Sequence, residues 1–144
     1  MKKSIKGTKT EKNLMAAFAS ESMAVCRYAY FAEAARQQGY EQVADIFLET
    51  AENEKVHAGM CMRLFEGGGV EVKAAWPASP PGNTKDNLDA AIEGESKTWQ
   101  IRYPAFSRTA REEGFDDIAA LFERIGADEK RHEERFSKIL EAWK

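Results

Sequence analysis

Glu54-Lys55-Val56-His57 and Glu129-Lys130-Arg131-His132 are two copies of one four-residue motif, Glu-x-x-His, and they lie 75 positions apart in the chain. Residues three positions apart share one face of a helix, so the glutamate and the histidine of each copy can reach the same region. The sequence contains only two histidines, and both fall in this motif. The two motifs and the positions around them are therefore the starting point for predicting the fold.

The two motifs belong to an internal repeat that covers most of the chain. Near the start of each copy the offset is 74 residues, as between Thr10 and Thr84. Further along the offset is 75 residues, and the matching pairs include Arg27 and Arg102, Tyr28 and Tyr103, Phe47 and Phe122, and Glu66 and Glu141. An ordered series of this length is not expected by chance, so the chain contains two copies of one helical hairpin.

Apolar periodicity and terminal glycines predict four helices. The first begins near Thr10, which we expect to be its N-cap, and ends at Gly39. The others run from about 41 to 66, from 84 or 86 to Gly114, and from about 116 to 143. We interpret the chain as a single domain (1–144) with a hairpin over 10–66, a crossover over 67–85 and a second hairpin over 86–143. Strand signals are nearly absent apart from residues 70–72, so the predicted fold class is all-α. Two hairpins joined by one long crossover form a four-helix bundle of ferritin-like topology.

The third predicted helix contains one residue more than the first. Ser22 and Arg27 are five positions apart, whereas their counterparts Ser96 and Arg102 are six positions apart. A single insertion within a continuous helix is commonly absorbed as a π-bulge, and such bulges favour functional sites. We predict a bulge at about residues 97–101.

Four carboxylates and both histidines interrupt the apolar stripes that face the predicted core. They are Glu21, Glu54, His57, Glu95, Glu129 and His132. A lone glutamate or histidine on a helix is more often a solvated or core residue than a ligand, but this paired arrangement is not expected from scatter. Buried carboxylates need compensation, and no lysine or arginine lies on these stripes at the same level. Two divalent cations balance four carboxylates, so we predict a dinuclear metal site of the kind found in ferritin-like bundles.

Further short motifs accompany these six residues. They are Lys6-Gly7-Thr8-Lys9-Thr10-Glu11-Lys12-Asn13-Leu14, Glu21-Ser22, Glu52-Asn53-Glu54-Lys55-Val56-His57-Ala58, Glu93-Gly94-Glu95, Tyr103-Pro104 and Glu129-Lys130-Arg131-His132-Glu133. In this order they resemble the rubrerythrin family over essentially the whole chain. The resemblance implies two iron ions held by the six residues, with manganese as the alternative metal. It also implies that the hydroxyls of Tyr28 and Tyr103 lie near the metals.

The activity implied by the resemblance is that of a non-haem di-iron peroxidase. Such a protein reduces hydrogen peroxide to water in oxidative-stress defence, with electrons from an external donor protein such as a rubredoxin. A ferroxidase or other iron-handling ferritin-like protein is the alternative, and it would assemble into a cage. An oxygenase and a metal-free structural bundle are further classes that metal analysis and substrate tests distinguish.

The sequence departs from the family pattern in two ways. Typical members add a rubredoxin domain with four cysteine ligands, whereas this sequence has two cysteines, Cys26 and Cys61, which we interpret as small buried hydrophobes. We therefore expect electrons to come from a separate protein. The family also has a glutamate at the position of Thr98, where it exchanges with the histidine matching His57 on one iron. We expect this exchange to be lost and His57 to stay bound in both redox states.

Composition excludes several classes of partner. Hydrophobic residues make up 43% and charged residues 31% of the chain, and the formal net charge is −3. An acidic domain without a basic stripe is not expected to bind nucleic acid. No apolar run approaches membrane-spanning length, so we expect a cytoplasmic protein without membrane contact. The resemblance implies a homodimer, and the long crossover permits exchange of helices between its subunits.

Overall fold

The computed structural model describes residues 2–73 and 79–143, so part of the predicted crossover, residues 74–78, lies outside the described residues. The first hairpin consists of α1 (Lys9–Gln37) and α2 (Glu41–Met62). The second consists of α3 (Thr84–Lys97), the π-helix η1 (Thr98–Arg102), α4 (Tyr103–Glu112) and α5 (Asp116–Glu141). Within the described parts of the chain no strand is present, residues 70–72 included, and the all-α prediction is confirmed.

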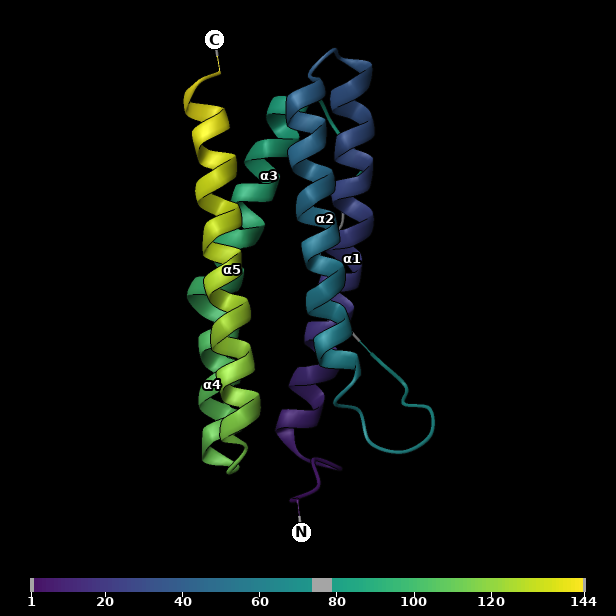
Figure 1. The fold of residues 1–144 in the computed structure, drawn as a ribbon, viewed down its shortest axis with the longest axis vertical. Helices are drawn as coiled ribbons and strands as arrows, with labels where there is room; N and C mark the ends of the chain where they lie inside the picture. Colours follow the sequence, from purple (N-terminus) through teal and green to yellow (C-terminus); the bar gives the residue numbers. More distant parts are fainter. Residues whose placement is uncertain (1, 74–78, 144) are drawn as a thin grey trace.

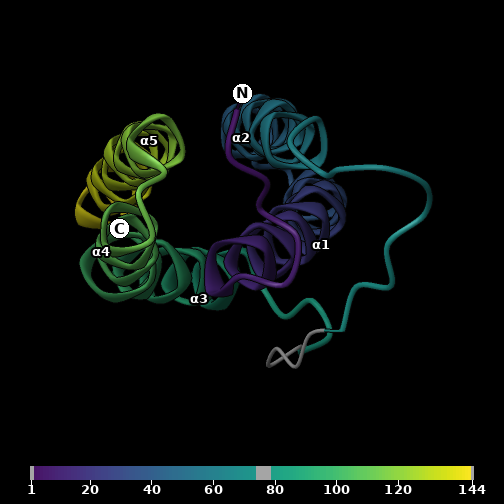
Figure 2. The same cartoon turned by 90° about the horizontal axis from the view of Figure 1, so that it is seen from below.

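The two hairpins lie side by side and form a four-helix bundle (Figure 1). α3, η1 and α4 follow one another along one side of the second hairpin and act as a single helix of the bundle. α2 ends at one end of the bundle and α3 begins at the other, so the crossover must return along its length. Seen from below, the described part of the crossover that follows α2 lies outside α1 (Figure 2). This confirms the predicted topology of two hairpins joined by one long connection.

Each hairpin turn ends its first helix in the same way. Gly39 and Gly114 have positive φ values of 83° and 78°, which residues other than glycine adopt only with strain. After each glycine a backbone N–H turns back to a helix carbonyl, from Tyr40 to Ala35 at 2.9 Å and from Phe115 to Ala110 at 2.8 Å. This is the Schellman arrangement, and it explains why a short turn follows each glycine.

The start of each hairpin is fixed by a threonine that contacts the other hairpin. The hydroxyl of Thr10 donates to Oε2 of Glu113 at 2.6 Å, and that of Thr84 donates to Oε1 of Gln38 at 2.9 Å. Our prediction that Thr10 caps the first helix is therefore wrong. Thr8 is the cap, and its side chain accepts from the backbone N–H of Glu11.

One helix boundary also differs from the prediction. α2 ends at Met62 rather than at residue 66, because the chain turns away from the helix through Leu64 and Phe65. α3 begins at Thr84, the earlier of the two predicted starts, after the cap Asn83. Among the described helices, none is both long and apolar enough to cross a membrane.

The apolar core is divided into two parts by a buried polar layer. One part includes Leu14, Tyr103, Phe115, Phe122 and Ile125. The other includes Tyr28, Phe31, Phe47, Leu88 and Phe136. The six residues predicted to form the metal site are all buried. Along each helix that carries them, they lie between residues of the first apolar part and residues of the second. The fold therefore holds charged side chains at its centre, where burial without compensation is costly.

Candidate metal centre

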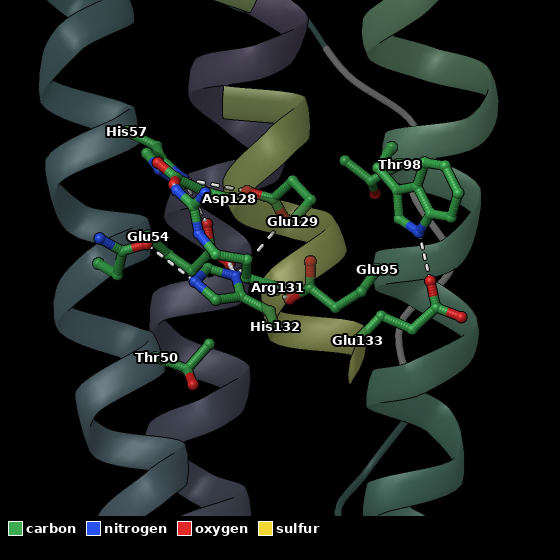
Figure 3. A network of polar contacts seen from close by, with 12 residues as sticks. Thr50, Glu54, His57, Glu95, Thr98, Asp128, Glu129, Arg131, His132 and Glu133 are labelled. Atoms are coloured by element: carbon green, nitrogen blue, oxygen red, sulfur yellow. Dashed lines mark hydrogen bonds and ion pairs between the residues drawn. The ribbon is translucent and has the colours of Figure 1, made fainter. Parts of the chain in front are cut away.

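The structure brings the six predicted residues into two overlapping groups. One group consists of Glu21, Glu54, His57 and Glu129, and the other of Glu54, Glu95, Glu129 and His132. In each group the ligand atoms lie within 4.8 Å of one another. Figure 3 shows Glu54 and His57 on α2 facing Glu129 and His132 on α5, with Glu95 reaching in from α3. The two groups are related by the sequence repeat, because each residue of one group has its counterpart in the other.

Glu54 and Glu129 occupy the middle of the cluster. Nδ1 of His57 lies 3.0 Å from Oε2 of Glu54 and 3.0 Å from Oε1 of Glu129. Nδ1 of His132 lies 2.9 Å from Oε1 of Glu54 and 3.9 Å from Oε2 of Glu129. Each of the two carboxylates therefore reaches both imidazoles with different oxygens, as a bridging ligand would.

Glu21 and Glu95 lie at the two ends of the cluster. Oε2 of Glu21 is 3.8 Å from Nδ1 of His57, and Oε1 of Glu95 is 3.6 Å from Nδ1 of His132. The imidazole ring centres are 6.0 Å apart. The arrangement has two positions, each with one histidine, one terminal carboxylate and a share of two central carboxylates.

The electrostatics of the cluster reflect an excess of negative charge. Burial raises the pKa of the Glu54 and Glu95 carboxyls, and the neighbouring carboxylates of Glu21 and Glu129 raise them further. Burial opposes a charge on His57 and His132, but the close contacts with the surrounding carboxylates prevail and raise the pKa of each imidazole to about 12. Without a cation the cluster therefore retains extra protons.

Several donor atoms in the cluster lack hydrogen bonds. Four buried atoms make no hydrogen bond of regular geometry, although three of them lie about 3 Å from another atom of the cluster: Oε1 of Glu54, Oε2 of Glu95, Oε1 of Glu129 and Nδ1 of His132. Buried polar atoms are almost always satisfied, so a convergent set of unsatisfied ones requires an explanation. Oxygen and imidazole donors suit iron or manganese, and two divalent cations match four carboxylates in charge. The residues present therefore fit a pair of metal ions.

Tyr28 and Tyr103 support the terminal carboxylates from the opposite hairpin. The hydroxyl of Tyr28 donates to Oε1 of Glu95, and that of Tyr103 donates to Oε1 of Glu21. Burial and the nearby carboxylates raise the pKa of both phenols well above 10. Both hydroxyls therefore remain protonated donors at the edge of the cluster.

Two residues that were not predicted from the sequence contact the outer nitrogens of the histidines. Nε2 of His57 lies 2.9 Å from Oδ2 of Asp128, and Nε2 of His132 lies 2.8 Å from Oδ1 of Asn53. Asp128 and Asn53 each stand directly before the glutamate of a motif, 75 positions apart. That spacing was the available signal, but a polar residue beside a helix stripe usually indicates a solvated position.

A cavity of about 660 Å³ leads to the cluster between α1 and the α3–η1 segment. Glu21, Glu95 and Glu129 line it, together with Arg27 and Arg102. No arginine was predicted at this level, because Arg27 and Arg102 each lie one position before a tyrosine and beside the apolar stripe. They are also related by the repeat. The cavity gives small molecules a route to three of the six residues.

Each arginine lies against the residue that precedes a terminal carboxylate. Nη1 of Arg102 donates to Oγ of Ser20 at 2.7 Å. Arg27 occupies the space beside Gly94, where a Cβ would lie 2.8 Å from Nη2. The buried Nε of Arg27 has no hydrogen-bond partner. Positive charge is therefore available on the wall of the cavity.

The predicted bulge and the cysteines can be placed as well. The π-helix spans Thr98–Arg102, one residue later than predicted, and confirms that the inserted residue is absorbed there. Thr98 is buried, lines the cavity and donates to the carbonyl of Gly94 at 2.8 Å. Cys61 is buried, as predicted, and its pKa is raised to about 12 by burial. Cys26 is exposed, so the prediction of a buried side chain is wrong for it.

A family model described as Rubrerythrin matches residues 12–140. The chain belongs to the rubrerythrin family. It is 51% identical over 140 residues to rubrerythrin from Porphyromonas gingivalis, an alignment that covers 97% of this chain and 70% of the relative. It is 46% identical over 134 residues to rubrerythrin from Nitratidesulfovibrio vulgaris, covering 93% of this chain and 70% of the relative.

Two solved structures share the fold of the chain. A structure described as the fully reduced, all-ferrous state of nigerythrin superposes with a TM-score of 0.84 at 34% identity, covering 96% of this chain and 71% of that one. Bacterioferritin BfrA from Mycobacterium tuberculosis superposes with a TM-score of 0.80 at 20% identity, covering 92% and 84%, which shows the shared fold. The ferritin-like prediction is confirmed.

Proposed function

We propose that this rubrerythrin-family chain holds two iron ions and reduces hydrogen peroxide to water with electrons from an external donor protein. The observation that carries the proposal is the pair of buried four-residue groups that share Glu54 and Glu129. Iron is favoured over manganese because the nigerythrin structure, 34% identical, is described as all ferrous. Glu21 with His57 would hold one ion and Glu95 with His132 the other.

When bound, a pair of iron ions supplies the two electrons that reduction of one peroxide molecule requires. The reaction also consumes two protons and yields two molecules of water. The chain supplies the route for peroxide, through the cavity to Glu21, Glu95 and Glu129. Tyr28 and Tyr103 hold protonated hydroxyls on Glu95 and Glu21, and so keep a proton beside each end of the cluster.

The supply of electrons and the assembly of the protein complete the proposal. A rubredoxin-type protein is the donor we propose, and a cytoplasmic homodimer, with or without exchanged helices, is the proposed form. All three proposals follow from the family resemblance. The two cysteines of these 144 residues are too few for a four-cysteine iron site within them, which is why the proposed donor is a separate protein.

The test combines metal analysis with peroxide consumption by the reduced protein under anaerobic conditions. We expect two irons per chain, with faster oxidation by hydrogen peroxide than by oxygen. Glu54→Gln should lower the iron content below two and abolish rapid oxidation, because it removes a shared ligand. Glu52→Gln is the matched control, since Glu52 lies on the same helix and its side chain is 76% exposed.

Three results would contradict the proposal. A wild-type chain without metal would exclude the centre altogether. Equal iron content in Glu54→Gln and Glu52→Gln would exclude Glu54 as a ligand. Faster oxidation by oxygen with assembly into a cage would favour the ferroxidase alternative, and size-exclusion chromatography detects that assembly.

A further inference from the structure

The two histidines of the cluster differ in what holds their outer nitrogen. In both rings Nδ1 faces the carboxylates of the cluster, on the side where a metal ion would bind. With Nδ1 as the ligand atom, Nε2 keeps the ring hydrogen and donates it outward. His57 donates to the carboxylate of Asp128, whereas His132 donates to the amide oxygen of Asn53. The two contacts have nearly the same length, 2.9 Å and 2.8 Å. They therefore differ in charge and hardly in geometry.

The charge on Asp128 is only partly neutralised. Arg131 pairs with the other oxygen of Asp128, but the arginine side chain is 68% exposed and the aspartate side chain 22% exposed. Solvent therefore screens the arginine more than the aspartate. The counterpart of Arg131 in the first hairpin is Val56, so nothing charged occupies that position next to Asn53. The chain has departed from its own repeat at both places.

A carboxylate partner makes a ligating imidazole more basic than an amide partner does. Hydrogen bonds with one ionised partner are roughly twice as strong as neutral ones. Changing such an outer partner typically alters metal affinity by about 10–100-fold. The ligand residues of the two positions correspond through the repeat, whereas Asp128 and Asn53 do not match in charge.

We propose that Asp128 is a positioning residue that makes the metal position at Glu21 and His57 the tighter of the two, so that it fills first. This inference rests on the proposed dinuclear centre and adds to it an order of loading. The Asn53 side then holds its metal more weakly, at Glu95 and His132.

The test exchanges the two outer partners and follows anaerobic titration of the metal-free chain with Co²⁺, whose absorption reports binding. The wild-type chain should bind in two steps whose affinities differ by at least about 10-fold. Asp128→Asn should weaken the first step by about 10–100-fold and merge the two steps. Asn53→Asp should tighten the second step. Asp117→Asn is the control, an exposed aspartate on the same helix that should change neither step.

The double variant Asp128→Asn with Asn53→Asp still has one aspartate and one asparagine at the outer nitrogens, but on exchanged histidines. It should again bind Co²⁺ in two steps, with the tighter position now at Glu95 and His132. Anomalous scattering from crystals with one Co²⁺ per chain identifies the filled position. We expect the Glu21 and His57 position in the wild-type chain and the Glu95 and His132 position in the double variant. Equal filling in both proteins, or the same position in both, overturns the inference. Absence of Co²⁺ from the wild-type chain overturns the proposed metal centre together with it.

Discussion

Tyr28 on α1 donates its hydroxyl hydrogen to Oε1 of Glu95 on α3, across the boundary between the two hairpins. The corresponding residues of the repeat make the same contact from the second hairpin to the first, because Tyr103 on α4 donates to Glu21 on α1. Each hairpin thus supplies a terminal carboxylate and receives its hydrogen-bond donor from the other. The cluster cannot form within one hairpin, so packing of the two hairpins and assembly of the site are the same event.

Tyr28→Phe and Tyr103→Phe should each destabilise the protein by about 1–3 kcal/mol, because each leaves a buried carboxylate oxygen without its donor while the ring remains packed. Urea unfolding of the metal-loaded protein measures the change. Tyr30→Phe is the control, since Tyr30 is 61% exposed on the same helix and should change the free energy of unfolding little. Equal effects at Tyr28 and Tyr30 would show that the buried hydrogen bond contributes nothing.

The metal-free protein should lose stability as the pH rises above about 6.5. The folded-state pKa of His57 and of His132 is raised from 6.5 to about 12, so their contribution is complete below pH 6.5 and is lost progressively toward pH 12. The raised pKa values of Glu54 and Glu95 act in the same direction above pH 4.5, because the folded state binds protons more tightly there. Each additional proton held by the folded state corresponds to about 1.4 kcal/mol per pH unit.

Metal should replace these protons and flatten the pH dependence. Thermal unfolding of the metal-free and the metal-loaded protein between about pH 6 and about pH 9 measures this difference. The range begins near the ordinary pKa of histidine. We expect the Tm of the metal-free protein to fall across the window and that of the loaded protein to change less. A Tm of the metal-free protein that rises with pH would contradict the assignment of extra protons to the cluster.

The sequence predicted which six residues come together at the core better than it predicted the residues that contact them. Histidine is scarce in this chain, so two histidines in the same motif stood out, and their positions agree with the structure. Asp128 and Asn53 did not stand out, because polar residues are common on helices and their contact crosses between hairpins. Thr10 was taken for a cap for a related reason, since its partner Glu113 lies more than 100 positions away. Local patterns carry no information about which distant residue a side chain will meet.

With threonine at position 98, His57 should stay bound to iron in both redox states. Its hydroxyl is engaged with the carbonyl of Gly94, and it offers no carboxylate to exchange with the imidazole. Crystals of reduced and oxidised wild-type protein should show the same distance from Nδ1 of His57 to iron within about 0.2 Å. Thr98→Glu should introduce a carboxylate into the cavity beside Glu21 and Glu95 and allow one iron to leave His57 on oxidation. Thr98→Gln, of equal size without the charge, should behave as the wild type, and iron movement in the wild type would refute the expectation.

Deletion of Gln100 should convert η1 into regular helix without displacing the cluster. Glu95 and Tyr103 are eight positions apart across the π-helix, whereas their counterparts Glu21 and Tyr28 are seven positions apart in regular helix. In both hairpins the tyrosine donates to the glutamate of the other hairpin, so the shorter spacing also permits this contact. Removing one residue restores the shorter spacing, so Tyr103 should still reach Glu21. We expect the free energy of unfolding to stay within about 1 kcal/mol of the wild type or to rise, since a regular helix replaces the wide turn.

The matched control is deletion of Met23, which lies between Glu21 and Tyr28 in α1 and is 39% exposed. No bulge is present there to absorb the loss, so every later residue of α1 should rotate by about 100°. Tyr28 would then leave Glu95, and the protein should lose more than about 4 kcal/mol or fail to fold. Urea unfolding distinguishes the two deletions, and equal destabilisation would refute the role assigned to η1. If the deletion of Gln100 preserves stability and iron content but slows peroxide consumption, the π-helix serves to shape the cavity wall at Thr98 rather than to hold the fold.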